Sequence, residues 1–203
     1  MRIGIIDYGM GNIHSVKKAV EFFGFKARII NNPKELKSID KLILPGVGGF
    51  SYALKNIKKL NLYSTLRDYL LKDRLFLGIC LGMQILFERS QEAEGEKGLG
   101  IIKGEVLRFN LKSSFKIPHI GWNRLNFKNP KCILFKNIPD GAYVYFCHSF
   151  YPLPEDDKIV CATTDYSIRF SSVIQKGNIF GIQFHPEKSQ KIGLKIIENF
   201  LKL

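Results

Sequence analysis

The chain has 203 residues, of which 45% are hydrophobic and 24% charged, and its formal net charge is +13. This balance is typical of a globular protein, and we expect a single domain over residues 1–203. No apolar run approaches the roughly 20 residues that a membrane helix needs. The N-terminus reaches Asp7 too soon for a signal peptide, so we expect a cytoplasmic protein without a membrane partner. The lysines are scattered and lack interleaved aromatic residues, so we expect no nucleic-acid partner.

The first half of the chain alternates strand and helix patterns. Short apolar runs predict strands at residues 2–7, 26–30, 41–44 and 75–79. Apolar residues at helical spacing predict helices at residues 12–23, 49–57, 62–71 and 80–89. Strands separated by helices imply a parallel sheet that is covered on both faces.

The second half has short segments that are rich in β-branched and aromatic residues and interrupted by Gly, Asn and Pro. They predict strands at residues 105–109, 142–146, 159–164, 168–175 and 179–184, followed by an amphipathic helix at 189–203. Residues 91–98 have the most loop-like composition. The fold class we expect is therefore α/β, in three layers, with a central mixed and largely parallel sheet.

One of the cysteines lies in a pattern that suggests chemistry. Gly78-Ile79-Cys80-Leu81-Gly82 follows a predicted strand and precedes a predicted helix, which is the cysteine form of a nucleophile elbow. A thiol at a helix N-terminus is activated by the helix dipole and by free N–H groups. A core cysteine between two packing glycines would have the same pattern. The cysteines show no spacing typical of a zinc site or a CxxC motif, so we expect no metal.

A base for this thiol is present near the C-terminus, in His185-Pro186-Glu187. Glu187 can hold the tautomer of His185 while His185 exchanges a proton with Cys80. A His-x-Glu sequence alone is weak support, and its occurrence together with the cysteine elbow strengthens the interpretation. The other histidines, His14, His119 and His148, are expected to be structural.

Acyl transfer also needs hydrogen-bond donors for an oxyanion. The N–H of Leu81 follows the nucleophile. Residues 44–50, Leu-Pro-Gly-Val-Gly-Gly-Phe, form a glycine-rich loop after a predicted parallel strand and should reach the same sheet edge as Cys80. A phosphate loop is the alternative, but the Gly-Lys-Ser/Thr ending of a Walker loop is missing.

Together, these motifs resemble the class I glutamine amidotransferases. A narrower match, in order along the whole chain, is to the glutaminase subunits of imidazole glycerol phosphate synthase. The motifs that carry it are Ile-Asp-Tyr-Gly-Met-Gly-Asn at 6–12, the loop at 44–50, Gly-Ile-Cys-Leu-Gly-Met-Gln at 78–84, Ile-Pro-His-Ile-Gly-Trp-Asn at 117–123 and Gly-Ile-Gln-Phe-His-Pro-Glu-Lys-Ser at 181–189.

The resemblance implies a class I glutamine amidotransferase fold and a role for each matching residue. Cys80 would form a glutamyl thioester with glutamine, and His185, oriented by Glu187, would protonate the leaving ammonia and then activate water. The oxyanion would be held by Leu81 and by the loop at Val47 or Gly48, with no cofactor. Residues that resemble the glutamine-binding positions are Gly48, Gln84, Ser149 and Phe150. Position 150 is more often Tyr in this family, and the Phe of this chain has no hydroxyl to offer there.

The family's partner is a (βα)8-barrel cyclase, bound as a heterodimer. It uses the ammonia to make imidazole glycerol phosphate and an aminoimidazole carboxamide ribotide in histidine biosynthesis. Four residues lie in motifs that face this partner in the family: Asn12, Trp122, Tyr145 and Lys188. Core packing is an equally good explanation for Trp122 from the sequence alone.

Three alternatives remain open at this stage. A paralogous glutaminase that supplies a sugar-amidating synthase would have nearly identical motifs. A stand-alone cysteine hydrolase would leave the motif at 117–123 without a role. A non-catalytic interaction module would not need all three members of the triad.

Overall fold

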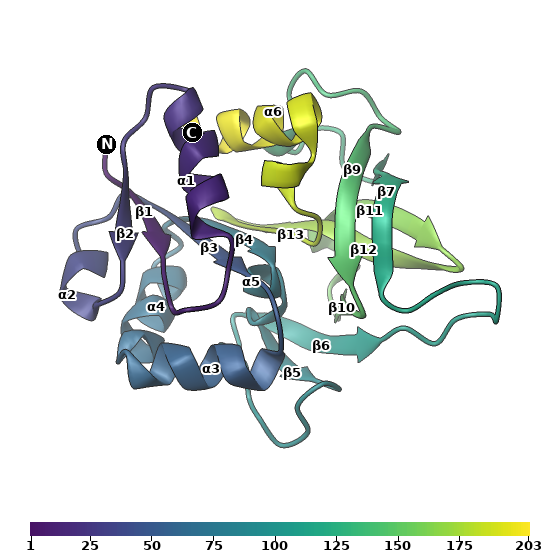
Figure 1. Cartoon of the computed structure of the whole chain (residues 1–203), viewed down its shortest axis with the longest axis horizontal. Helices are drawn as coiled ribbons and strands as arrows, with labels where there is room; N and C mark the ends of the chain where they lie inside the picture. The colour runs from purple at the N-terminus through teal and green to yellow at the C-terminus, as the bar shows by residue number, and fades with distance from the viewer.

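The fold is organised around a mixed sheet of eight strands in the order β2-β1-β3-β4-β13-β12-β11-β8. Neighbouring strands from β2 to β13 run parallel, and those from β13 to β8 run antiparallel. The computed structural model describes all residues, 1–203. It confirms the expected α/β class with a mixed, largely parallel central sheet (Figure 1).

The elements of the first half are β1 (Ile3–Ile6), α1 (Ile13–Phe22), β2 (Ala27–Ile30), α2 (Pro33–Leu36), β3 (Lys41–Gly46), α3 (Phe50–Lys59), α4 (Leu62–Leu71), β4 (Leu75–Cys80), α5 (Leu81–Gln84) and β5 (Phe87–Ser90). The second half contains β6 (Ile102–Arg108), β7 (His119–Arg124), β8 (Asn126–Phe127), η1 (Ile133–Phe135), β9 (Tyr143–His148), β10 (Phe150–Pro154), η2 (Asp157–Ile159), β11 (Val160–Tyr166), β12 (Ile168–Lys176), β13 (Ile179–Ile182), η3 (Pro186–Lys188) and α6 (Gln190–Leu201). No helix is both long and apolar enough to cross a membrane.

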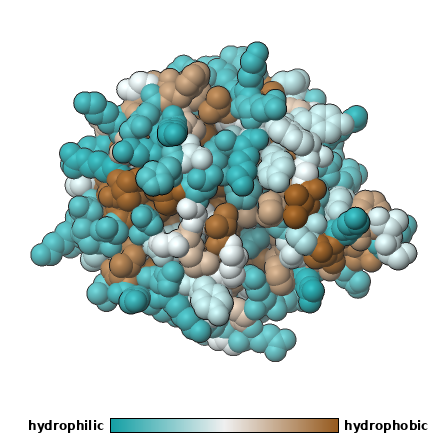
Figure 2. All heavy atoms as spheres, in the orientation of Figure 1, coloured by the Kyte–Doolittle hydropathy of each residue, from teal (hydrophilic) through white to brown (hydrophobic).

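Apolar side chains form two cores, one on each face of the central sheet. Helices α1 and α6 lie on one face, and α3 and α4 lie on the other, as Figure 1 shows. A three-stranded sheet, β10-β6-β5, adds to the α3 and α4 side, and the two-stranded sheet β7-β9 stands beside α6. On the face drawn in Figure 2, polar and charged side chains cover most of the surface, and apolar residues form small separate patches.

The carboxyl ends of three central strands, β3, β4 and β13, bring the chemical motifs together. Gly46 at the end of β3 is the register partner of Cys80 at the end of β4. Strand β13 pairs with the other side of β4, so the segment that follows it, with His185, emerges at the same edge. Adjacent parallel strands that end together place the glycine-rich loop, Cys80 and His185 at one edge of the sheet.

One predicted element is wrong. Residues 80–89 do not form a helix: α5 stops at Gln84, and residues 87–90 form β5. The carbonyls of Ile85 and Leu86 accept hydrogen bonds from the N–H groups of Leu99 and Ile101, which draws the chain into a sheet with β6. A fully buried apolar run has no face to distinguish helix from strand, and here the long-range pairing decides. Strand β3 also continues through Pro45, where we expected it to stop.

Candidate active site

Cys80 occupies a backbone conformation that is rare for a residue with a side chain. It ends β4 and precedes α5 directly, with φ 53° and ψ −109°. Non-glycine residues avoid positive φ unless the surrounding structure holds them there, and such positions concentrate at functional sites. The sharp turn lifts the thiol out of the strand and into a cavity, so the structure forms the elbow that the sequence predicted.

Two glycines permit the close packing of this turn. A Cβ atom on Gly82 would lie 1.9 Å from the carbonyl oxygen of Leu44, and a Cβ atom on Gly78 would lie 2.6 Å from the carbonyl oxygen of Gly82. No real Cβ atom approaches backbone so closely. The positive φ thus falls on Cys80 itself, and the two glycines allow β3, β4 and α5 to approach closely.

The Cys80 thiol lies among polar groups from distant segments. The side-chain amide of Gln183 donates towards Sγ at 3.6 Å, and the carbonyl oxygen of Cys147 lies 3.9 Å from it. Nδ1 of His185 lies 3.0 Å from Oε1 of Glu187, and both side chains are almost fully buried, with exposures of 4% and 2%. Cys80, His185 and Glu187 therefore lie in an arrangement that could act as nucleophile, base and orienting carboxylate.

The surroundings of His185 favour its protonated form. Burial lowers its pKa, but hydrogen bonds to Cys80 and Glu187, together with their charges, outweigh burial and raise the pKa of His185 to about 10. Because Nδ1 of His185 is bonded to Glu187, Nε2 is the ring nitrogen left to hydrogen-bond with Cys80. The imidazole can thus hold a proton beside the sulfur atom at neutral pH.

The backbone of His185 is fixed to strand β9. Its N–H donates to the carbonyl oxygen of Tyr145 at 2.9 Å. The buried hydroxyl of Ser189 donates to the carbonyl oxygen of His185 at 2.6 Å and accepts from the N–H of Tyr145 at 2.9 Å. His185 is therefore positioned by β9 of the small sheet as well as by the short helix η3 that follows it.

A cavity of about 360 Å³ opens over the thiol. That volume lies within the range of small-molecule sites, roughly 300–1,000 Å³. Most of the residues predicted for the site line it: Val47, Gly48, Cys80, Leu81, Gln84, Ser149, Phe150, His185 and Lys188. Glu187 is not part of the lining and reaches the site through His185.

Gln84 has its amide group oriented by two acceptors. Its Nε2 donates to the carbonyl oxygen of Phe150 at 3.0 Å and to Oε1 of Gln183 at 3.1 Å. Only the nitrogen can donate to a carbonyl, so the amide orientation is determined. Gln84 Oε1 has no partner in the chain and is not sealed from solvent, which leaves one acceptor for a ligand at the cavity wall.

The glycine-rich loop offers free donors. The backbone N–H groups of Val47 and Gly48 donate no hydrogen bond within the chain. Gly48 has φ 92°, in the left-handed region that glycine tolerates. The side chain of Val47 is 42% exposed. A loop with free N–H groups beside a nucleophile can bind an oxyanion.

Comparison with known proteins places this geometry in a family. The family model described as "Glutamine amidotransferase class-I" matches residues 4–203. The chain belongs to the class I glutamine amidotransferase family. The crystal structure of PurLQS from Thermotoga maritima superposes with a TM-score of 0.75, at 23% identity, over 99% of this chain and 97% of that one. At that identity the superposition supports the fold alone.

Two relatives narrow the family further, and each is named imidazole glycerol phosphate synthase subunit HisH. The protein from Methanocaldococcus jannaschii is 53% identical over 202 residues, which cover 99% of both chains. The protein from Aquifex aeolicus is 51% identical over 201 residues, covering 98% of this chain and 96% of that one. Within the amidotransferase family the chain groups with the HisH subunits, which confirms the resemblance noted from the sequence.

Three of the residues predicted to face a partner lie together in this amidotransferase. Trp122 on β7 and Tyr145 on β9 are register partners with ring centroids 6.1 Å apart. Nζ of Lys188 lies 5.8 Å from the centre of the Tyr145 ring. Trp122 is 46% exposed, so core packing does not account for it. Asn12 precedes α1, which packs against η3, and its side chain makes no capping hydrogen bond.

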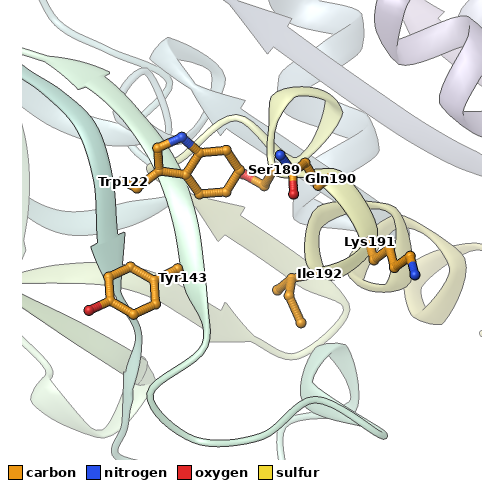
Figure 3. A pocket seen from close by; sticks show the side chains of 6 residues that line it. All are labelled: Trp122, Tyr143, Ser189, Gln190, Lys191 and Ile192. Atoms are coloured by element: carbon orange, nitrogen blue, oxygen red, sulfur yellow. The ribbon is translucent and has the colours of Figure 1, made fainter.

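A second cavity, of about 510 Å³, lies beside these residues. Trp122 projects from the small sheet towards Ser189 at the start of α6, whereas the hydroxyl end of Tyr143 points away from α6 (Figure 3). Gln190, Lys191 and Ile192 complete the wall. The side chain of Lys191 extends away from the two aromatic rings (Figure 3). No member of the triad lines this cavity.

The sequence interpretation missed five residues of the cavity region: Gln183 and the lining residues Glu92, Pro118, Cys147 and His148. Gln183 bridges Gln84 and Cys80, and His148 lines the cavity. Gln183 stands two residues before His185 in the same motif, and alternation along an extended segment was the available signal. Nothing local distinguished His148 from a core histidine.

Proposed function

We propose that the chain hydrolyses glutamine to glutamate and ammonia through Cys80, His185 and Glu187. The observation that carries this proposal is the thiol at a strained elbow, next to a buried His185–Glu187 pair and under a cavity that fits a small molecule. Membership of the class I glutamine amidotransferase family supports the same reaction.

The first half of the reaction forms a thioester. Sγ of Cys80 attacks the carboxamide carbon, and the carbonyl oxygen becomes an oxyanion held by the N–H of Leu81 and by one from Val47 or Gly48. The carbon–nitrogen bond then breaks, and His185 donates its proton to the departing nitrogen, which leaves as ammonia. A His185 with a pKa of about 10 carries that proton at neutral pH.

The second half reverses the role of the histidine. Once the sulfur atom is acylated, the hydrogen bond and the charge from Cys80 that raise the pKa of His185 disappear, while burial still lowers it. The imidazole can then accept a proton from water as the water attacks the thioester. Breaking the carbon–sulfur bond releases glutamate and restores the thiol.

The substrate's amino-acid head would bind at the far end of the cavity. Gln84 Oε1 is free to accept from the α-ammonium group. The backbone at Gly48, Ser149 and Phe150 lines the same region. Because these contacts come mainly from backbone, the Phe at position 150 needs no hydroxyl to take part.

We also propose that the ammonia passes to a (βα)8-barrel cyclase that docks on β7 and β9 and makes imidazole glycerol phosphate. The outward side chains there are unusually apolar for a surface: Ile120 is 58% exposed, Trp122 46% and Tyr143 47%. Exposed apolar residues gathered on one sheet indicate a protein partner. The 510 Å³ cavity beside Trp122 would receive a side chain of that partner.

Glutamate release tests both parts of the proposal. The purified chain is assayed alone, then with the candidate cyclase and its ribulosyl substrate, beside Cys80→Ala. Strong stimulation that disappears in Cys80→Ala is the expected result. Full activity without a partner would contradict the docking proposal, and absence of stimulation with a reactive Cys80 would favour a sugar-amidating synthase as the partner.

A further inference from the structure

Two buried histidines have no role in the reaction described so far. His119 on β7 and His148 on β9 are register partners, with exposures of 2% and 5%. Nδ1 of His119 lies 3.1 Å from Nε2 of His148. The His119 ring stacks on Phe146 and Tyr166, with centroid distances of 4.9 and 3.9 Å. Polar rings in such an apolar setting are costly unless every hydrogen-bonding atom is paired.

The direction of each hydrogen bond follows from its chemistry. Nδ1 of His148 lies 2.8 Å from the carbonyl oxygen of Phe150 and must donate to it. With one proton on its ring, His148 accepts at Nε2 from Nδ1–H of His119. His119 in turn accepts at Nε2 from the amide of Asn123, at 3.4 Å. Both rings are therefore neutral and protonated at Nδ1, consistent with burial, which lowers the pKa of His119 to about 4 and that of His148 to about 3.

The same carbonyl connects the histidines to the catalytic cavity. The oxygen of Phe150 accepts from His148 and also from Gln84. Gln84 then donates to Gln183, and Gln183 donates to Sγ of Cys80. An unbroken series of hydrogen bonds therefore runs from β7 to the nucleophile, and every member has its donor and acceptor determined.

We infer that His119 and His148 are positioning residues for glutamine: they fix the carbonyl of Phe150, which fixes Gln84 and so the part of the cavity that receives the substrate's amino-acid head. The inference rests on the proposed function. Neither histidine takes a proton in the reaction. The two histidines determine the position of Gln84 Oε1. Their loss should therefore weaken binding of the head group and leave the reactivity of the thiol unchanged.

Protection of Cys80 by glutamine separates these two effects. Iodoacetamide has no amino-acid head, so its reaction with Cys80 measures the thiol alone. The glutamine concentration that halves this reaction measures binding of the head group. In His148→Phe, which keeps a ring but loses both hydrogen bonds, the half-protecting concentration should rise about tenfold or more. The iodoacetamide rate without glutamine should stay within about twofold of the wild type.

Conservative variants test the hydrogen bond itself. Asn places an amide N–H near the position of Nδ1, so His148→Asn should restore most of the protection that His148→Phe loses. His119→Phe should shift protection in the same direction but less, because His148 keeps its bond to Phe150. Tyr166→Phe is the matched control: its ring stacks on His119, but its hydroxyl bonds Lys116 outside the series. It should change neither measurement.

Three results would overturn the inference. The first is unchanged protection in His148→Phe, and the second is an equal loss in His148→Asn and His148→Phe. The third is a His148 protonated at Nε2 in nitrogen NMR spectra of the wild-type chain at pH 7, a measurement that stands even if a variant does not fold. If glutamine does not protect wild-type Cys80 at all, the proposed glutaminase function fails, and this inference with it.

Discussion

His185 and Glu187 form a buried pair in which Nδ1 and Oε1 lie 3.0 Å apart, while the second carboxylate oxygen, Oε2, is buried without a hydrogen-bond partner. An unpartnered buried carboxylate oxygen is costly in isolation, and the charge on His185 offsets that cost. The pair is therefore stable mainly when the imidazole is protonated.

Glu187→Gln should lower glutaminase kcat by about 10³-fold or more, since a comparable change in a catalytic triad has an effect of about 10⁴. The neutral amide removes one of the interactions that raise the pKa of His185, so the fraction of protonated histidine at pH 8 to 9 should fall. The pH profile of kcat in complex with the cyclase measures this. Glu198→Gln is the control, because Glu198 pairs only with Lys195 on α6 and Lys202 just after it.

Gly82→Ala should destabilise the fold by about 3 kcal/mol or more, since the new Cβ would lie 1.9 Å from the carbonyl oxygen of Leu44 and the elbow would have to move. Urea unfolding measures the change. Gly24→Ala is the control: a Cβ there meets nothing within 4 Å, and the only cost is its φ of 79°, about 1 kcal/mol. Equal losses in both variants would show that close packing at Gly82 is unimportant.

The buried histidine pair should make the protein sensitive to acid. The pKa values of about 4 for His119 and about 3 for His148 lie below their ordinary value of 6.5. Below pH 6.5 the unfolded chain therefore binds protons that the folded chain does not, and the free energy of unfolding falls as pH drops. Together the two histidines lower the free energy of unfolding by about 3 kcal/mol as the pH drops from 6.5 to 5.

His119→Phe/His148→Phe should unfold with a flatter pH dependence over this window, measured by urea titration at each pH. The raised pKa of His185 acts in the opposite range, because its contribution to stability is present below pH 6.5 and is lost as pH rises towards 10. It leaves the acid window unaffected. An unchanged slope in the double variant would mean that the histidines stay protonated and paired in the fold.

Trp122→Ala should weaken binding of the cyclase by about 2 kcal/mol, roughly 30-fold in Kd, since large aromatic residues near the centre of an interface dominate affinity. The side chain is 46% exposed, so the thermal unfolding midpoint should change little. Titration calorimetry with the cyclase measures binding. Phe22→Ala, on the far end of α1 from Asn12 and 72% exposed, is the apolar surface control. Equal Kd values for both variants would move the docking site away from β7.

The residues that line the candidate site were largely predictable from local sequence. The elbow at Cys80 and the His185–Glu187 pair are defined by residues within a few positions of one another, and parallel strands bring their ends together by a general rule. Trp122 was ambiguous between core and interface, because alternation along a strand does not say which face is covered. In the structure Trp122 pairs with Tyr145 on the neighbouring strand β9 and is 46% exposed, so it lies on the surface.

The sequence by itself determined the α/β class and the places of the Cys80 elbow, the His185-Pro186-Glu187 motif and the glycine-rich loop, because strand ends and sharp turns leave local patterns in the sequence. The tertiary structure alone decided that residues 87–90 form a strand, that Gln84 and His148 share the carbonyl of Phe150, and that Gln84 also donates to Gln183. Gln84 and Gln183 are 99 residues apart. Contacts over such separations depend on how the whole core closes, and a local pattern of apolar and polar residues carries no information about them.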